Sequence, residues 1–342
     1  MSKINFSVIE IPNVTKNTYQ EIVNDKNSYV SYGTNNKFPD FLWSLYTECP
    51  THQSIIDGKV DYVFGNGITN GEDTINEQGE TLNDIIKKIA LDQQLYGGFA
   101  IQIVYNNAGK IYGIYWTDFG KIRTSKNGKE LFFNDMWDSY NNKFTKYDSF
   151  DINANNKTSQ ILYFKSPTCR GFYPIPSYLA AIPSITTEIK IQQYHLNNIT
   201  NGFASSFVLN MNNGIPEEDD RKKMETDITN KFCGSENSGK LLINWNDNPE
   251  NASTVEKIET NDFDTKFQQL AKDTQRNIFI SHRVTSPVLF GVVPENTGFS
   301  KTEYKEAFDV FNATVIHPQQ LQIEGAFNKI YGGDFKIQPL SI

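Results

Sequence analysis

The amino-acid sequence predicts an α+β fold, in which a block of strands follows a group of helices instead of alternating with them. Apolar residues recur at helical spacing between residues 41 and 96, and again from residue 177 onward. From Phe99 to Tyr163, apolar and polar residues alternate with the period of two typical of strands. The 342 residues suffice for two domains or for one elongated subunit of several parts.

Three predicted helices precede the strands. The segment "DFLWSLYTECPTHQSIIDGKVDYVFGNGI" predicts two short helices broken at Pro50, and Gly65-Asn66-Gly67 ends the second of them in the manner of a glycine C-cap. The third helix, residues 81–96, is amphipathic. Its apolar face carries Leu82, Ile85, Ile86, Ile89 and Leu95.

Four segments then show the strand pattern: "FAIQIVYN", "KIYGIYWTD", "GKELFFND" and "SQILYFK". Asn-Gly and Gly-Lys pairs separate them and are typical of turns. These segments predict the β part of the fold.

Two further predicted helices enclose a small insert. An apolar stripe identifies the first helix and consists of Ile185, Ile189, Leu196, Ile199 and Phe203; the second helix starts at Phe263. Residues 205–260 predict a strand, a helix and a strand, and they hold eleven acidic and six basic residues. The acidic run from Glu217 to Asp220 follows Pro216, where negative charge favours a helix N-terminus. We interpret the run in this way rather than as a cation site.

An apolar loop and a long helix complete the pattern. The loop, residues 285–300, carries Val288, Leu289, Phe290, Val292, Val293 and Phe299, although loops are usually polar. Such a loop either packs against a neighbouring surface or lines an opening. Ser300 and Glu303 fit a capping box at the start of the last helix, Pro318 predicts a kink in it, and Gly332-Gly333 ends it. The aromatic residues of its stripe, Tyr304, Phe308 and Phe311, are expected to be core.

Charge and composition exclude several classes of protein. The formal net charge is −8 and no basic stripe is visible, which argues against a sequence-specific DNA-binding protein but is compatible with a conduit that must not grip DNA. The three cysteines form no CxxC pair, the four histidines are dispersed, and no segment resembles a leader or a membrane span. No catalytic, cofactor-binding or metal-binding residue is therefore expected.

One motif suggests nucleotide chemistry. Gly234 to Lys240 fits the spacing GxxxxGK, but Leu241 occupies the position of the Ser or Thr that would bind Mg²⁺. The predicted order is also inverted, because a P-loop lies after a strand and before a helix. We therefore interpret the segment as a turn.

The order of elements resembles the core of phage portal proteins. "HRVTSPVLFG" is similar to that family's turn after a helix, and "GFSKTEYKEAFDVFNATVIHPQQLQIEGAFNKIYGG" is similar to its long helix with a proline in the middle. "YGTNNKFPDFLWSLYTECPTHQSIIDGKVDYVFGNGI" resembles the opening of portals from phages of Bacteroidetes-like hosts. The resemblance covers about residues 30–333, and the order of the motifs is more specific than any one of them.

This resemblance implies an elongated portal-type subunit with a wing, a helical stem, a small α/β clip and a long kinked helix. The implied parts are a wing α+β region at 1–176, stem helix 1 at 177–204, the clip at 205–260, stem helix 2 at 261–284, a tunnel loop at 285–300, the long kinked wing helix at 301–333 and a short C-terminal segment at 334–342. Nine residues follow Gly333, so the resemblance implies that the helical crown of many portals is reduced or absent, or that the gene product is longer.

The resemblance also implies two functional segments. The tunnel-loop residues that would form the channel constriction are Val292, Val293, Pro294, Glu295, Asn296, Thr297, Gly298 and Phe299. The clip residues that would dock the motor and the adaptor are Glu217, Glu218, Asp219, Asp220 and Trp245.

The implied protein is a non-enzymatic homo-oligomeric ring, of twelve subunits, at one capsid vertex of a virion that assembles in the host bacterial cytoplasm. Its partners would be the terminase large subunit, the head–tail adaptor, the major capsid protein and double-stranded DNA that passes through without sequence preference. No cofactor and no membrane are implied. Two alternatives remain: another phage head or neck connector protein, and a nucleotide-binding enzyme built around Gly234–Lys240.

Overall fold

The computed structural model describes most of the chain. The described residues are 21–23, 28–69, 71–137, 143–154, 158–167, 169–200, 207–211, 217–232, 241–245, 263–292 and 300–340. The chain forms two compact units, which we call unit 1 (residues 1–183 and 277–342) and unit 2 (residues 184–276). Each unit is described by itself.

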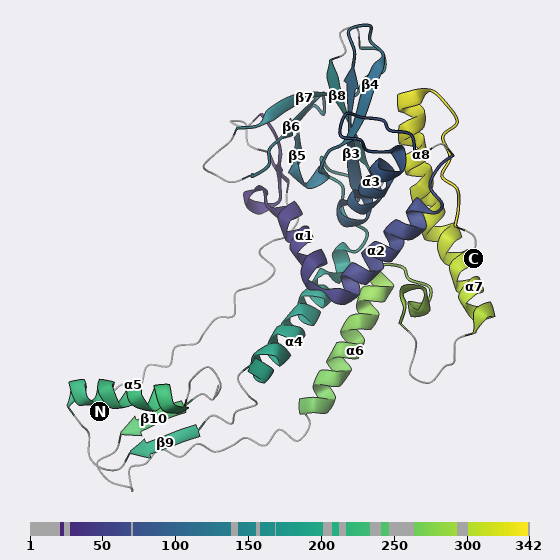
Figure 1. The fold of residues 1–342 in the computed structure, drawn as a ribbon. Helices are drawn as coiled ribbons and strands as arrows, with labels where there is room; N and C mark the ends of the chain where they lie inside the picture. Colours follow the sequence, from purple (N-terminus) through teal and green to yellow (C-terminus); the bar gives the residue numbers. More distant parts are fainter. Residues whose placement is uncertain are drawn as a thin grey trace. The chain divides into compact units, whose positions relative to one another are not determined.

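Unit 1 is built on a six-stranded mixed sheet with the strand order β4-β3-β8-β7-β6-β5 (Figure 1). Neighbouring strands are antiparallel except for β7 and β8, which run parallel. β3 lies between β4 and β8, and its first four residues are buried. The strands are β3 (Gly98–Tyr105), β4 (Ile111–Trp116), β5 (Ile122–Thr124), β6 (Glu130–Phe133), β7 (Thr145–Ser149) and β8 (Ser159–Lys165).

Three helices before the sheet match the sequence prediction: α1 (Phe38–Glu48), α2 (Pro50–Phe64) and α3 (Leu82–Tyr96). Pro50 is the first residue of α2, where its missing N–H needs no partner. Thr81 caps α3 through a capping box with Asp84. All five apolar residues predicted for one face of α3 are buried, and this face packs on the sheet through β3.

A short pair of strands and a tight turn precede α1. β1 (Glu21–Ile22) pairs antiparallel with β2 (Ser31–Tyr32), and the 3₁₀-helix η2 (Thr34–Asn36) follows. Asn35 and Asn36 both have positive φ values, 57° and 63°. The side-chain oxygen of Asn36 stabilises this turn by accepting a 2.9 Å hydrogen bond from the backbone N–H of Tyr32.

The long C-terminal helix is interrupted by a π-helical turn. α7 (Lys301–Phe311) is followed by η7 (Asn312–Ile316), which is π-helical, and then by α8 (His317–Tyr331). The irregularity predicted at Pro318 is this turn, because a proline within a helix removes one backbone donor and crowds the preceding turn. Ser300 caps α7 and Gly332 ends α8, as predicted.

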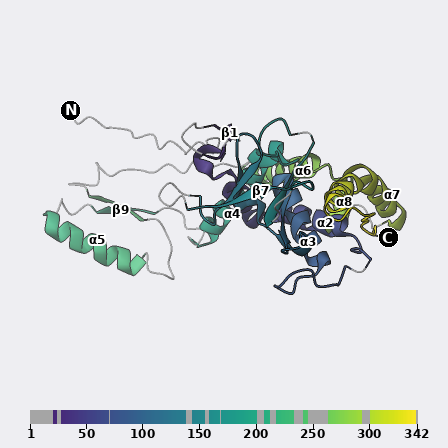
Figure 2. The same ribbon diagram turned by 90° about the horizontal axis from the view of Figure 1, so that it is seen from above.

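This helix packs on α2, and the two views of the ribbon place α8 beside α2 (Figures 1 and 2). Gln320 of α8 donates hydrogen bonds to the carbonyl oxygens of Tyr62 and Val63 near the end of α2, where few backbone partners remain. Phe308 and Phe311 are buried core residues, in agreement with the sequence interpretation.

Unit 2 contains a helix pair and a small β-α-β element. Its elements are α4 (Ile182–Thr200), β9 (Phe207–Met211), α5 (Glu218–Phe232), β10 (Leu241–Trp245) and α6 (Phe263–Ser281). The N-terminal end of α4 and the C-terminal end of α6 belong to unit 1. β9 and β10 pair in parallel, as two strands joined through a helix can. Tyr194 of α4 stacks on Phe267 of α6 with 5.2 Å between ring centroids.

The apolar stripe predicted for α4 is only partly buried within one chain. Ile185 and Ile189 are buried, whereas Leu196 is 63% exposed. Ile199 and Phe203 lie outside the residues whose side chains are described. Helical periodicity thus predicted the helix but not how much of its apolar face a single subunit covers.

Candidate functional site

The acidic segment predicted to lie in the insert forms the N-terminal end of α5. Glu217, Glu218, Asp219 and Asp220 are all exposed, and the last three occupy the first helical turn, where the helix dipole favours negative charge. Exposed lysines of the same helix, Lys222 and Lys223, lie 2.8 Å and 3.8 Å from Glu218 and Asp220. Trp245 ends β10, and its side chain lies outside the described part.

The apolar loop 285–300 is described up to Val292, and the expected constriction residues 293–299 lie outside the described residues. Its first half is not a free loop. Residues Pro287–Phe290 form a 3₁₀-helix (η6) that ends at Gly291, whose φ of 79° favours glycine. Leu289 and Phe290 are buried, so these two apolar residues belong to the core of unit 1.

Aromatic contacts anchor this half of the loop to unit 1. The hydroxyl of Tyr62 on α2 donates a 2.7 Å hydrogen bond to the carbonyl oxygen of Leu289. The ring of Phe290 meets those of Tyr62 and Phe311 edge to face, with centroids 5.9 Å and 5.7 Å apart. Gly58 leaves room for the Phe290 ring, since a Cβ at Gly58 would lie 2.7 Å from it.

Both ends of the loop are fixed on α7. The Thr285 hydroxyl donates a 2.8 Å hydrogen bond to the carbonyl oxygen of Ala307. At the other end, the Ser300 hydroxyl accepts a hydrogen bond from the backbone N–H of Glu303. Thr285 and Ser300 thus attach the two described ends of the loop to α7.

A buried histidine pair lies directly before this loop in the sequence. His52 Nδ1 of α2 and His282 Nε2 are 3.0 Å apart and share one hydrogen bond, in which one ring donates and the other accepts. Their other nitrogens, His52 Nε2 and His282 Nδ1, are buried without a hydrogen-bond partner among the described residues. The ring of Tyr178 lies 4.4 Å from that of His52. The pair joins the end of α6 to α2 and so fixes the base of the loop.

Burial lowers the pKa of each basic group in this cluster. Desolvation, together with the charge of nearby Lys59, lowers the pKa of His52 to about 3 and holds the pKa of His282 well below its usual value. The ammonium of Lys59 is itself buried, and desolvation, with the charge of Arg283, lowers its pKa to about 8. These buried basic groups indicate a structural cluster in which adding a proton to either histidine is costly.

The other chemical candidates find no support in the described residues. α5 precedes the segment Gly234–Lys240 and β10 follows it, which is the reverse of a P-loop, and the segment itself lies outside the described part. The described ranges contain no group of three or more His, Cys, Asp or Glu that could hold a metal ion. None of the described helices combines the length and the apolar character needed to cross a membrane.

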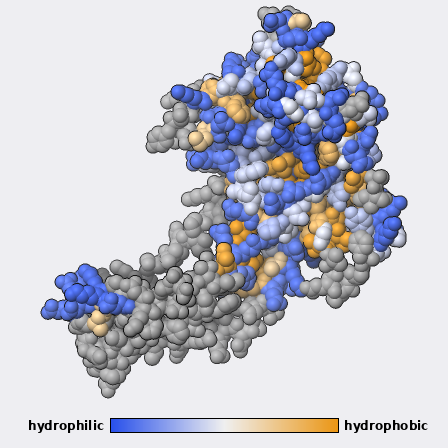
Figure 3. All heavy atoms as spheres, viewed as in Figure 1, coloured by the Kyte–Doolittle hydropathy of each residue, from blue (hydrophilic) through white to orange (hydrophobic). Residues whose placement is uncertain are grey.

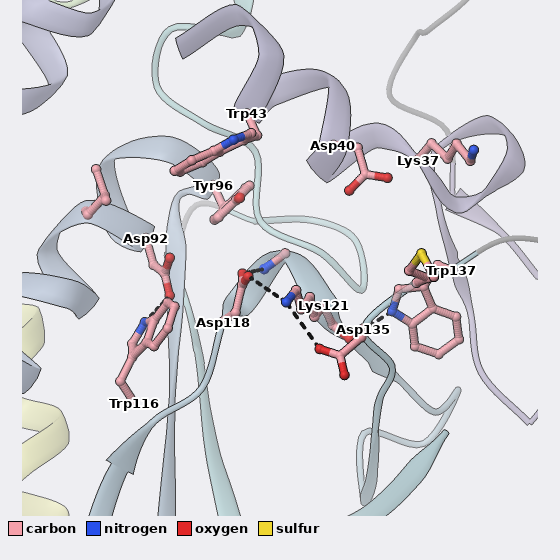
Figure 4. A pocket seen from close by; sticks show the side chains of 13 residues that line it. Lys37, Asp40, Trp43, Asp92, Tyr96, Trp116, Asp118, Lys121, Asp135 and Trp137 are labelled. Carbon is pink, nitrogen blue, oxygen red and sulfur yellow. Dashed lines mark hydrogen bonds and ion pairs between the residues drawn. The ribbon is translucent and has the colours of Figure 1, made fainter. Parts of the chain in front are cut away.

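Sequence reasoning missed two sites. The His52–His282 pair joins residues 230 positions apart, which no spacing pattern reveals. A pocket of about 570 Å³ in unit 1 is lined by residues of α1, α3, β4 and the segment from Asp118 to Trp137 (Figure 4). Three of its residues are tryptophans, Trp43, Trp116 and Trp137. These tryptophans lie far apart in the sequence, so no local pattern indicated the pocket.

Comparison with solved structures shows the fold. A chain in the structure described as "Virion of native gene transfer agent (GTA) particle" matches with a TM-score of 0.57 and 12% identity, over 88% of this chain and 83% of that one. A chain in "Neck of empty GTA particle computed with C6 symmetry" gives 0.55 and 13%, over 88% and 83%. A chain in "Neck of native GTA particle computed with C12 symmetry" gives 0.55 and 11%, over 95% and 87%.

Sequence comparison gives the family. No curated protein sequence matches the chain significantly. The family model described as "Phage portal protein" matches residues 77–338, and this range includes the whole six-stranded sheet, the helix pair with its insert, the anchored loop and the long helix. Because the match spans well over half of the chain and follows the order of elements described above, the chain belongs to the phage portal protein family.

Proposed function

We propose that this chain is the subunit of a ring that forms the DNA channel at one vertex of a phage-type capsid, for genome packaging and ejection. The observation that carries this proposal is the family match over residues 77–338. The fold supports it, because the structures that it resembles are a virion and particle necks. The protein is accordingly a virion component made in the host cytoplasm.

The ring contains twelve copies in this proposal. Support comes from one of the similar structures, a particle neck computed with C12 symmetry. Large apolar side chains exposed on the helix pair, Tyr194 and Leu196 on α4 and Leu270 and Ile280 on α6, also favour association. Figure 3 shows orange apolar patches among blue hydrophilic side chains on the face of unit 1 that is in view.

Each part of the chain has a role in this ring. Helices α4 and α6 lie within the segments 177–204 and 261–284 expected to form the stem, and the β-α-β element lies within the clip, 205–260. The exposed acidic turn Glu217–Asp220 and Trp245 of the clip dock the terminase large subunit during packaging and the head–tail adaptor afterwards. The major capsid protein surrounds the wing, and residues 292–299 narrow the channel.

The mechanism is steric and electrostatic, and no catalytic step is assigned to the chain. With a net charge of −8, the protein repels DNA phosphates and limits their adhesion to the channel wall. The loop anchored at Leu289, Phe290 and Ser300 holds its tip at the same radius in every copy of a symmetric ring. A constriction of this kind opposes backward movement of the packaged DNA and still lets the DNA duplex pass through the channel.

Imaging the purified full-length chain along its axis by electron microscopy tests the proposal. Closed rings that form without DNA are expected, and the number of subunits distinguishes a portal from another connector protein. A chain that stays monomeric at micromolar concentration and unfolds cooperatively would overturn the proposal. Nucleotide binding by the purified chain would instead favour the enzyme alternative.

A second experiment tests the loop. Replacing residues 292–298 with a short Gly-Ser linker leaves the anchor residues Leu289 and Phe290 in place, so ring assembly and thermal stability are expected to stay unchanged. DNA retention in the capsid is expected to fail. Rings that dissociate while the subunit remains folded would show that the loop is interface core and would refute its role as a constriction.

A further inference from the structure

The pocket between α1, α3 and β4 contains a buried carboxylate with an unused oxygen (Figure 4). Asp92 is 3% exposed, and its Oδ2 accepts hydrogen bonds from Trp116 Nε1 at 2.8 Å and from the backbone N–H of Phe119 at 3.3 Å. Its Oδ1 has no hydrogen bond, and Asp92 has no ion pair, with any residue in the described ranges. Burying a charge without a partner costs free energy, so this carboxylate can gain by binding a cation.

A second buried polar group faces the same pocket. Tyr96 is 4% exposed, and its hydroxyl, which lines the cavity, forms no hydrogen bond within the part of the chain that the structure describes. Burial and the charges of Asp92 and Asp118 raise the pKa of Tyr96, so this hydroxyl stays neutral and can accept a hydrogen bond. Asp92 Oδ1 and the Tyr96 hydroxyl therefore both lie on residues that line this pocket and are available to a ligand that enters it.

The cations near the pocket are already engaged or turned away. The ammonium of Lys121 lies 3.9 Å from Asp118 and 3.2 Å from Asp135. Lys37 points away from Asp92 at the far edge of the pocket (Figure 4). Burial, followed by the negative charge of Asp118, raises the pKa of Asp92 well above its usual value. A cation bound between Asp92 and Asp118 would relieve both the burial and the repulsion.

The walls of the pocket favour an organic cation over a metal ion. Trp43 and Tyr96 present aromatic surface, which attracts guanidinium and ammonium groups, whereas the ring of Trp116 already has the ammonium of Lys88 5.4 Å from its centre. The described residues include no group of three acidic, histidine or cysteine side chains for a metal. A planar guanidinium can bind a carboxylate with two N–H groups and stack on an aromatic ring at once, which an ammonium cannot do. The volume of about 570 Å³ exceeds that of one side chain, so a short stretch of the partner's chain can enter with it.

We propose that this pocket binds a guanidinium group, and that in the assembled protein the group is an arginine side chain of a second copy of this chain. The choice of a second copy rests on the proposed ring, because symmetry gives every copy the same neighbours, and a pocket at the interface would receive the same residue in each copy. Three of the chain's five arginines are available: Arg170, Arg276 and Arg283 are exposed and form no ion pair within the described ranges. In this proposal the pocket lies at the subunit interface and receives an arginine of a neighbouring copy.

The binding step is tested on dissociated full-length subunits with ethylguanidinium as the probe. Three of the chain's four tryptophans line the pocket, so the probe is expected to change tryptophan fluorescence with saturation. Ethylurea, the neutral molecule of the same shape, is expected to cause no such change. The variant Asp92→Asn, which keeps an acceptor for Trp116, is expected to raise Kd at least about tenfold. Asp309→Asn, an exposed site on α7, is the matched control.

Trp43→Ala provides a second variant that does not disturb the core, since Trp43 is 47% exposed. It is expected to weaken binding of the probe because it removes one aromatic wall. Absence of saturable binding by the wild-type subunit, or equal binding by Asp92→Asn, would overturn the pocket proposal. This result is independent of ring formation, so it separates a failure of the pocket from a failure of the proposed function.

The source of the guanidinium is tested on assembled rings. If a neighbour's arginine fills the pocket, rings are expected to show no fluorescence response to ethylguanidinium, and Asp92→Asn is expected to raise the concentration needed for assembly at least about tenfold. One of the variants Arg170→Gln, Arg276→Gln and Arg283→Gln is expected to reproduce this loss and to restore the response of the rings to the probe. Rings that bind the probe as well as free subunits do would refute a second copy as the source.

Discussion

Both oxygens of Asn36 bind the buried guanidinium of Arg123. The Asn36 side-chain oxygen accepts from Arg123 Nε, and its backbone oxygen accepts from Nη2 at 2.8 Å. Arg123 is 1% exposed, and its Nη1 donates to the carbonyl oxygens of Gly120 and Ile122. Its guanidinium carbon lies 4.9 Å from the centre of the Trp137 ring. A single buried arginine thus joins the turn before α1 to the sheet.

Replacing this arginine is expected to destabilise unit 1. Arg123→Met keeps the aliphatic bulk but removes four buried hydrogen bonds, and a loss of about 3 kcal/mol in the free energy of unfolding is expected. Denaturant titration followed by circular dichroism measures it. Arg170→Met, at an exposed position, is the control and should change the stability little. Equal stability of both variants would show that the Asn36 contacts contribute nothing net.

The loop anchor gives a second prediction. Phe290→Ala removes a buried ring that packs on Tyr62 and Phe311, and a loss of about 3 kcal/mol is expected. Gly58→Ala should act on the same contact, because its Cβ would approach the Phe290 ring to 2.7 Å. Protease cleavage within residues 285–300 should become faster in both variants. Val310→Ala, at an exposed position on α7, should leave stability and cleavage unchanged.

Lys59 predicts a stabilising substitution. Its pKa is lowered to about 8 in the folded chain from an ordinary value of 10.5, so folding carries a penalty of about 3 kcal/mol wherever the lysine is charged in both states, that is, below pH 8. Lys59→Met is expected to raise Tm at pH 7. The gain should shrink as pH rises from 8 to 10.5, because the unfolded lysine then loses its proton as well. Lys110→Met, in an exposed turn, should show no such trend.

The histidine pair predicts sensitivity to acid. In the folded chain the pKa of His52 is about 3, below the ordinary 6.5, so between these values the unfolded chain binds the extra proton and stability falls as pH falls. Lowering the pH from 6.5 to 4 is expected to remove about 3 kcal/mol through His52 alone. His52→Gln should flatten this part of the Tm–pH curve, whereas His317→Gln, at an exposed position, should leave it unaltered.

The net charge predicts weak DNA binding. The chain has a formal net charge of −8 and no basic stripe, so it is expected to bind double-stranded DNA weakly and without sequence preference. The affinity is expected to fall as the salt concentration rises. Fluorescence anisotropy with two unrelated duplexes over a salt series measures this. Nanomolar affinity that persists at about 0.2 M salt would contradict a channel that lets DNA slide.

Much of the fold was predictable from local pattern. The break at Pro50, the buried face of α3, the strand–helix–strand insert and the start of the last helix at Ser300 all follow from residues within a few positions of one another. Periodicity and capping act over one or two turns, so a single sequence records them. The order of these elements also carried the resemblance to phage portal proteins, which the family match confirmed.

Only the tertiary structure decided the sites. The sequence pointed to an apolar loop, but packing against Tyr62 and Phe311 made Leu289 and Phe290 core. The contacts of Asn36 with Arg123 and of His52 with His282 join residues 87 and 230 positions apart, and the pocket at Asp92 combines a helix, a strand and two loops. Burial and pKa depend on which surfaces meet across the fold, and that is set by packing of the whole chain rather than by any local spacing.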